Sequence, residues 1–260
     1  MTEKFKIALA VPSYKGFVAV DHATSVQDLF LSRPANVEWV RISSVGCGVL
    51  PRARNSQVAT ALANGCTHVL FVDDDIGFNP QDVYRMIARD VGVIGAVPQK
   101  RNSQWNEPPS LAVTPKGLKY YPELGVAVPI EPRLPMALTL IKAEVFQTIR
   151  EKGMAQPFVY PRITDEANKH LAMFFGYELE AAPEWSFEYA VAQRIGVEAV
   201  TDDGEDHYFV RRAALAGYDI FIDTEAELRH YEGMVCHDFS LKKHFAAHPE
   251  DLVPYTAEAA

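Results

Sequence analysis

The chain has 260 residues, 48% of them hydrophobic, and its 34 acidic and 25 basic side chains give a formal net charge of −9. This length supports one sizeable core, so we expect a single domain. The acidic balance excludes tight, sequence-independent binding of nucleic acid or an anionic membrane by the surface as a whole.

The first half of the chain alternates short apolar runs with amphipathic segments, which is typical of βαβ units around a mainly parallel sheet. The expected strands are Phe5 to Val11, Val37 to Ile42, His68 to Val72 and Val91 to Val97. The expected helices are Val20 to Leu31, one from Pro51 to Leu62, and one that begins at Pro80.

Prolines divide the middle of the chain into short pieces, which predict small antiparallel hairpins at Leu118 to Tyr121 and Val126 to Ile130. A strand (Ala137 to Ile141) and a helix (Ala143 to Lys152) should follow. Aromatic residues between Pro157 and Glu198 suggest a packed lid or pocket wall. The last predicted elements are a helix from Gly204 to Gly217 and two short strands, Asp219 to Ile222 and Leu228 to Tyr231.

Three features of the sequence indicate the cellular compartment of the protein. The apolar run from Ile7 to Val11 is too short for a signal-peptide core, and no apolar stretch approaches the ~18 to 20 residues that span a bilayer. Cys47, Cys66 and Cys236 are too scattered for a disulfide framework or a zinc site. We therefore expect a cytoplasmic protein without integral membrane contact.

The strand His68 to Val72 ends in three consecutive acids, Asp73, Asp74 and Asp75. If the extended geometry persists, Asp73 and Asp75 point to one side of the strand and Asp74 to the other. Two converging carboxylates favour a hard divalent ion, Mg²⁺ or Mn²⁺, which would in turn hold a diphosphate. The alternative is that the three acids cap the following turn and helix.

Two further groups carry candidate chemistry. Glu205 and Asp206 open a predicted helix, where a carboxylate could act as a general base or could simply be a first-turn residue. His230 ends a predicted strand, and as a third ligand beside carboxylates it would favour Mn²⁺ over Mg²⁺.

The order of these parts resembles the GT-A glycosyltransferases, especially their family-2-like branch. The resemblance rests on short motifs in sequence order, which are Val11-Pro12-Ser13-Tyr14, Pro51-Arg52-Ala53-Arg54-Asn55, Val72-Asp73-Asp74-Asp75, Glu205-Asp206-His207-Tyr208 and His230. It implies a metal-dependent transferase that moves a sugar from a nucleotide-sugar, with a UDP-sugar favoured, to an acceptor hydroxyl. It also implies a nucleotide-sugar-binding half at 1–115, an acceptor-binding half at 116–240 and a C-terminal tail at 241–260.

The resemblance assigns roles to matching positions. Donor binding is expected of Pro12, Ser13, Tyr14 (packed on the base), Arg52, Asn55, Asp73, Asp74 and Lys100, the last with Arg101 beside it. Metal binding is expected of Asp73, Asp75 and His230. Asp206, with Glu205 beside it, is expected to be the catalytic base of an inverting reaction. A retaining reaction remains open, as does the oligomeric state.

Compact proteins of this type resemble glycosyltransferases of bacteria and their phages, whose acceptors range from surface glycans to hydroxymethylated DNA bases. The acceptor could therefore be a glycan, a small molecule or a flipped-out DNA base. Two other functions stay open. One is a Mg²⁺-dependent hydrolase of the haloacid dehalogenase type, which also ends a strand in Asp-x-Asp. The other is a non-catalytic module that binds a divalent ion or a carbohydrate.

Overall fold

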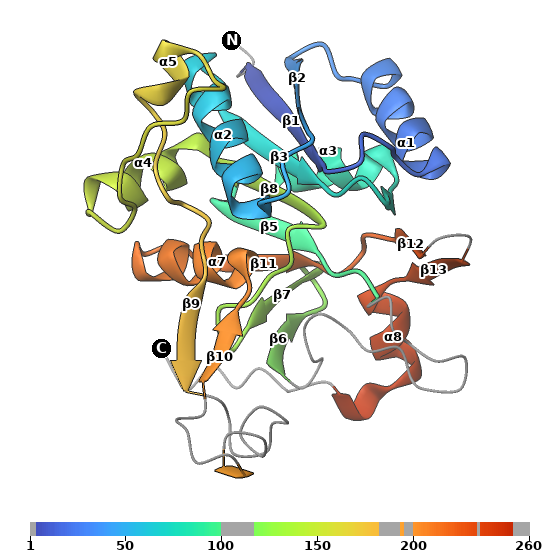
Figure 1. Ribbon diagram of the computed structural model, residues 1–260. Coiled ribbons are helices and arrows are strands. Elements are labelled where there is room, and N and C mark those ends of the chain that lie inside the picture. The colour runs from blue at the N-terminus through green and yellow to red at the C-terminus, as the bar shows by residue number, and fades with distance from the viewer. Residues whose placement is uncertain (1–3, 100–116, 182–192, 195–199, 233–234, 252–260) are drawn as a thin grey trace.

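The structure is a computed structural model that describes residues 4–99, 117–181, 193–194, 200–232 and 235–251 (Figure 1). The N-terminal elements form a βαβαβ unit. They are β1 (Phe5–Ser13), α1 (Val20–Leu31), β2 (Val37–Val45), α2 (Leu50–Ala63) and β3 (His68–Val72). β1 pairs in parallel with both β2 and β3. The helix α1 and the strand β3 have the bounds that the sequence predicts.

The remaining elements include the predicted proline-flanked hairpin and two short antiparallel sheets. In chain order they are β4 (Ile76–Gly77), α3 (Pro80–Ala88), β5 (Val93–Ala96), β6 (Leu118–Tyr121), β7 (Val126–Pro129), β8 (Leu138–Lys142), α4 (Ala143–Glu151), α5 (Asp165–Asn168), β9 (Glu178–Ala181), β10 (Val200–Asp203), α7 (Glu205–Leu215), β11 (Ile220–Asp223), β12 (Leu228–Glu232), β13 (Val235–Phe239), α8 (Leu241–Ala247) and a 3-10 turn (Pro249–Asp251).

The central sheet has eight strands in the order β2-β1-β3-β8-β5-β11-β7-β6. β8 runs antiparallel to both of its neighbours, and so does β7, whereas the other strands share one direction. The smaller sheets are the pair β10-β9 and the three-stranded sheet β13-β12-β4. The predicted α/β fold with a mainly parallel sheet and a smaller antiparallel section is therefore confirmed.

Helices cover both faces of the central sheet (Figure 1). The alternating residues Ile7 and Leu9 of β1 pack in the core that includes α1 and α3, whereas Ala8 and Ala10 pack in the core that includes α2, α4 and α7. A strand buried on both faces needs apolar side chains at every position. This explains why β3 is a continuous apolar run whose residues are all buried.

Two predictions for the second half need correction in part. Tyr160 lines a cavity, as expected of a pocket wall, but Phe174 and Phe175 are fully buried and pack against Phe146 and Phe209 in the core. The expected tail begins with the helix α8, which buries Leu241 and the ring of Phe245. Among the described residues, no helix combines the length and the apolar character that crossing a membrane requires.

Candidate functional site

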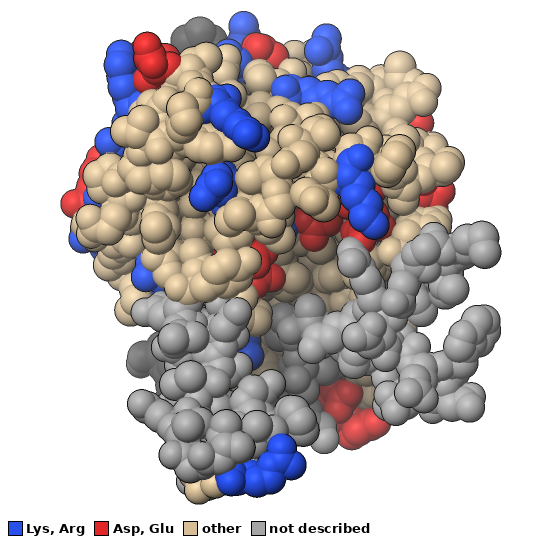
Figure 2. Space-filling view, in the orientation of Figure 1, with Lys and Arg blue, Asp and Glu red and all other residues tan. Residues whose placement is uncertain are grey.

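The three acids after β3 form a tight turn. The amide of Asp73 still bonds to the carbonyl of Ala137, at 3.0 Å, but the amide of Ile76 turns back to the carbonyl of Asp73, at 3.2 Å. The extended geometry thus ends at Val72, and the alternation that would place the Asp73 and Asp75 side chains together does not continue through the turn. In the space-filling view, acidic side chains gather near the middle of the visible face, beside a basic one (Figure 2).

Asp73 is bound to a buried arginine of α2. The Arg54 side chain is 2% exposed, and its Nη2 lies 2.9 Å from Oδ1 of Asp73. Its Nη1 donates to Oε1 of Glu205, at the start of α7. The guanidinium also lies 5.9 Å from the ring centroids of Phe71 and Phe175. A planar, permanently charged group with several donors suits this position between two carboxylates and two rings.

The sequence analysis did not single out Arg54, and it predicted donor binding for Arg52 instead. Arg52 is exposed, and its guanidinium lies 5.5 Å from the ring centroid of Tyr160. Both arginines lie in the same helical turn, and every residue from Ala53 to Ala59 is buried, so the helix has no apolar stripe that would separate them. The sequence therefore contains no signal that identifies Arg54 as the buried arginine.

The two acids at the start of α7, Glu205 and Asp206, have different surroundings. The Glu205 side chain is 14% exposed, and burial raises the pKa of its carboxyl, although the Arg54 cation acts in the opposite direction. Asp206 is half-buried, and its Oδ1 accepts the amide of His207 at 2.8 Å. Arg54 therefore joins this pair to the acids after β3, which are far away in the sequence.

Asp75 lies beside His230, as the sequence analysis expected. Nε2 of His230 is 3.7 Å from Oδ2 of Asp75, and Nδ1 is 2.6 Å from the carbonyl oxygen of Gln99. A ring nitrogen facing a carbonyl must be the one that carries the proton, so Nε2 is the acceptor nitrogen in the neutral ring. Histidine ligands of metals are commonly oriented by such a bond from the other ring nitrogen.

The predicted ligands only partly meet the requirements of a metal site. In the part of the chain that the structure describes, no three His, Cys, Asp or Glu side chains cluster as metal ligands. Asp75 and His230 are close enough to contact one cation together, whereas Asp73 is held by Arg54. The residues present therefore fit a cation held by two protein ligands and completed by ligands of another molecule, as a diphosphate would supply.

The expected donor residues lie at the ends of β1 and α2. Pro12 is buried, Tyr14 is 66% exposed, and the Ser13 hydroxyl donates to the carbonyl of Phe17 at 3.1 Å. Asn55 is not available at the surface, since its amide group bonds to both the amide and the carbonyl of Phe175. Asp74 is half-buried, and Lys100 and Arg101 lie outside the described residues.

Two cavities flank these strand ends. One of about 330 Å³ lies between α1 and the ends of β1 and β2, and it includes Ser13 and the buried His22, whose pKa is lowered by burial. The other, of about 270 Å³, lies between β2 and α2 and includes Val45 and Gln57. Such volumes are at the lower end of those that hold small molecules.

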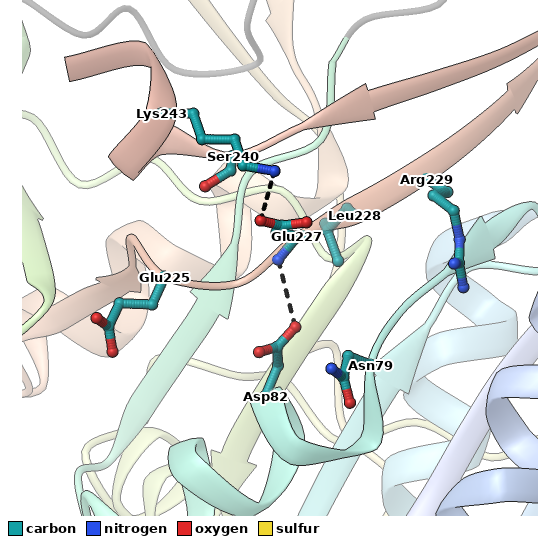
Figure 3. Close-up of a pocket in the computed structure, with 8 residues that line it drawn as sticks. All are labelled: Asn79, Asp82, Glu225, Glu227, Leu228, Arg229, Ser240 and Lys243. Atoms are coloured by element: carbon teal, nitrogen blue, oxygen red, sulfur yellow. Dashed lines mark hydrogen bonds and ion pairs between the residues drawn. The ribbon is translucent and has the colours of Figure 1, made fainter. Parts of the chain in front are cut away.

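A larger cavity, of about 590 Å³, lies elsewhere, between α3, β12 and α8 (Figure 3). Within it, Lys243 pairs with Glu227 at 2.7 Å, and the amide of Glu227 donates to the Asp82 carboxylate at 3.3 Å. Its lining contains none of the predicted site residues. Its other charged groups pair with residues outside the lining, Glu225 with Lys242 and Arg229 with Asp21, so we place the candidate site at the strand ends and not in this cavity.

No protein-family model matches the chain, and comparison with curated proteins also finds no match. The function must therefore be inferred from the geometry of the strand-end site itself.

Proposed function

We propose that the protein is a metal-dependent glycosyltransferase of the GT-A type, which moves a sugar from a nucleotide-sugar to an acceptor hydroxyl. The observation that carries the proposal is the convergence at one end of the sheet of Asp73, Asp75, His230 and Glu205, joined in part by Arg54. In open α/β sheets, ligands bind outside the carboxyl ends of the strands, which is where these groups lie.

The donor diphosphate is expected beside Asp75 and His230. A bound Mn²⁺ or Mg²⁺ would supply positive charge to the leaving nucleoside diphosphate. Asp75 and His230 would hold that ion, and the contact of His230 with the carbonyl of Gln99 keeps its ring oriented for that task. Tyr14, exposed directly after the end of β1, is the residue that would pack on the base, and a UDP-sugar remains the favoured donor.

The acceptor hydroxyl must lose a proton, and Asp206 is the proposed base. Glu205 is less suited to this role because Arg54 binds its carboxylate. Instead, Arg54 and Glu205 would fix the start of α7 relative to Asp73, and so the position of Asp206. The contact of Arg54 with Asp73 disfavours the hydrolase alternative, because Asp73 would be its nucleophile and a carboxylate held by an arginine is a weakened nucleophile. Glycans and hydroxymethylated DNA bases both remain candidate acceptors.

The first test is a thermal shift assay with a panel of nucleoside diphosphates, each with and without Mn²⁺. A ligand that binds only the folded protein raises its melting temperature. We expect one nucleotide to give a Mn²⁺-dependent shift that disappears in Asp75→Ala. Asp28→Ala is the matched control, since it removes an exposed carboxylate from α1. Absence of a shift with every nucleotide would refute the proposal.

A second assay separates a transferase from a binding module. The wild-type protein is incubated with UDP-glucose and Mn²⁺ together with candidate acceptors, and release of UDP is followed. A transferase releases UDP in an acceptor-dependent manner, and Asp206→Asn should abolish that release while leaving the thermal shift intact. Binding without any release would support the non-catalytic module instead.

A further inference from the structure

The segment that carries His230 is attached to the acidic turn through a short ladder. β12 pairs antiparallel with β4, with His230 opposite Ile76. The amide of Tyr231 also donates to the carbonyl of Asp75, at 3.0 Å. The position of the His230 ring relative to Asp75 therefore depends on how firmly β12 is held against this turn.

One carboxylate contacts the residues on both sides of His230. Asp21 Oδ2 lies 3.0 Å from Nε of Arg229 and also accepts the hydroxyl of Tyr231. In a β-strand, residues i−1 and i+1 lie on one face and residue i lies on the other. Asp21 thus contacts side chains on the face of β12 opposite to the one that carries His230.

The close approach of Asp21 depends on a glycine in β4. A Cβ placed on Gly77 would lie 2.9 Å from Cβ of Asp21 and 3.1 Å from Nε of Arg229, so a side chain there would push the pair apart. Asp21 itself is anchored near the acidic turn, because the amide of Ala19 at the start of α1 donates to the carbonyl of Asp74 at 2.8 Å.

We propose that Asp21 is the positioning residue of the candidate ion site. By holding Arg229 and Tyr231 on one face of β12, it keeps His230 on the other face, directed toward Asp75. The proposal rests on the proposed function, in that it gives Asp21 a role in binding the ion that the donor diphosphate needs. Asp21 itself does not touch that ion.

The test compares Asp21→Asn with Asp28→Asn, which removes the same charge from the exposed side of the same helix. We measure the Kd for Mn²⁺ alone from the electron paramagnetic resonance signal of the free ion. We also measure hydrogen exchange of the Tyr231 amide, which reports opening between β12 and the turn. Asp21→Asn should raise the Kd by about tenfold, in the range seen when a group that orients a metal ligand is removed. It should speed Tyr231 exchange to a similar degree, and Asp28→Asn should change neither.

Three further variants keep the test decisive. Arg229→Gln should give defects of the same kind, and the double variant Asp21→Asn with Arg229→Gln should be no worse than Asp21→Asn alone, because that variant has already lost the contact with Arg229. Tyr231→Phe, which removes only the hydroxyl, replaces Asp21→Asn if that variant does not fold.

The outcomes distinguish this inference from the proposed function. Unchanged Tyr231 exchange in Asp21→Asn overturns the positioning role, and so does faster exchange with an unchanged Kd for Mn²⁺. If the wild-type protein binds Mn²⁺ neither alone nor with a nucleoside diphosphate present, the metal-dependent function fails. The exchange data would then still decide whether Asp21 holds β12 against the acidic turn.

Discussion

Replacement of Arg54 by methionine should destabilise the protein more than replacement of any other arginine on α2. Methionine fills a similar volume but leaves Asp73 and Glu205 facing each other without a cation. Removal of one partner from a buried ion pair typically costs 3 to 5 kcal/mol, and the 34% exposure of the Asp73 side chain reduces that cost through solvent screening. We therefore expect the free energy of unfolding to fall by about 2 to 4 kcal/mol.

The loss should depend on pH in a defined direction. In Arg54→Met, Glu205 keeps the burial that raises its pKa and loses the neighbouring cation that lowers it. The folded state then holds a proton at Glu205 at pH values where the unfolded state, with a pKa near 4.5, has lost it. The contribution of such a group therefore lowers the free energy of unfolding as the pH rises through the folded-state pKa. The difference from wild type should therefore be larger at pH 8 than at pH 5.

Urea unfolding followed by circular dichroism at both pH values measures these differences. Arg52→Met is the matched control, because Arg52 lies on the same helix but is exposed and contacts Tyr160. It should change the free energy of unfolding by less than about 1 kcal/mol at either pH. An equal effect of the two substitutions, or a loss in Arg54→Met that does not vary with pH, would show that Arg54 does not bridge the two carboxylates.

Three further predictions concern buried residues of the fold. Asn55→Ala should lower the free energy of unfolding by about 2 to 3 kcal/mol in urea, since it leaves the buried amide and carbonyl of Phe175 unbonded. Gly95→Ala should lower it by about 1 to 3 kcal/mol, because the added Cβ would lie 2.4 Å from Oγ1 of Thr139; an unchanged midpoint would contradict this close approach. His68, whose pKa burial lowers to about 4, should remain neutral in NMR titrations down to about pH 5. Its contribution to stability, complete above its ordinary pKa of 6.5, should be lost as the pH falls toward 4.

Local patterns predicted the elements well where one physical rule dominated. The run His68 to Val72 is apolar at every position because both faces of β3 are covered, and Asn79 and Pro80 mark the start of α3 through a cap and a fixed φ. Such local rules could not predict that β8 pairs with both β3 and β5. Antiparallel insertion of a late strand depends on contacts far apart in sequence, which no local period encodes.

The candidate site shows the same contrast between features that local sequence predicts and features that depend on distant contacts. The sequence located Asp73 and Asp75 at a strand end, but their orientation depended on whether the strand continued, and a turn ends it at Val72. Arg54 could not be distinguished from Arg52 because the helix is buried on most sides. Long-range ion pairs are set by packing and leave no period in the sequence.

Two separate sets of contacts therefore stabilise the turn after β3. Arg54 links Asp73 to Glu205 on α7, and Asp21 holds the strand whose His230 faces Asp75. Each acid of the Asp-x-Asp pair thus has a separate support, and the two supports share no residue. Because uncoupled sites have additive effects, combining Arg54→Met with Asp21→Asn should lower stability by the sum of the single losses, within about 0.5 kcal/mol. A strongly non-additive result would show that the acidic turn moves as one rigid unit, and that Asp73 and Asp75 cannot be positioned independently.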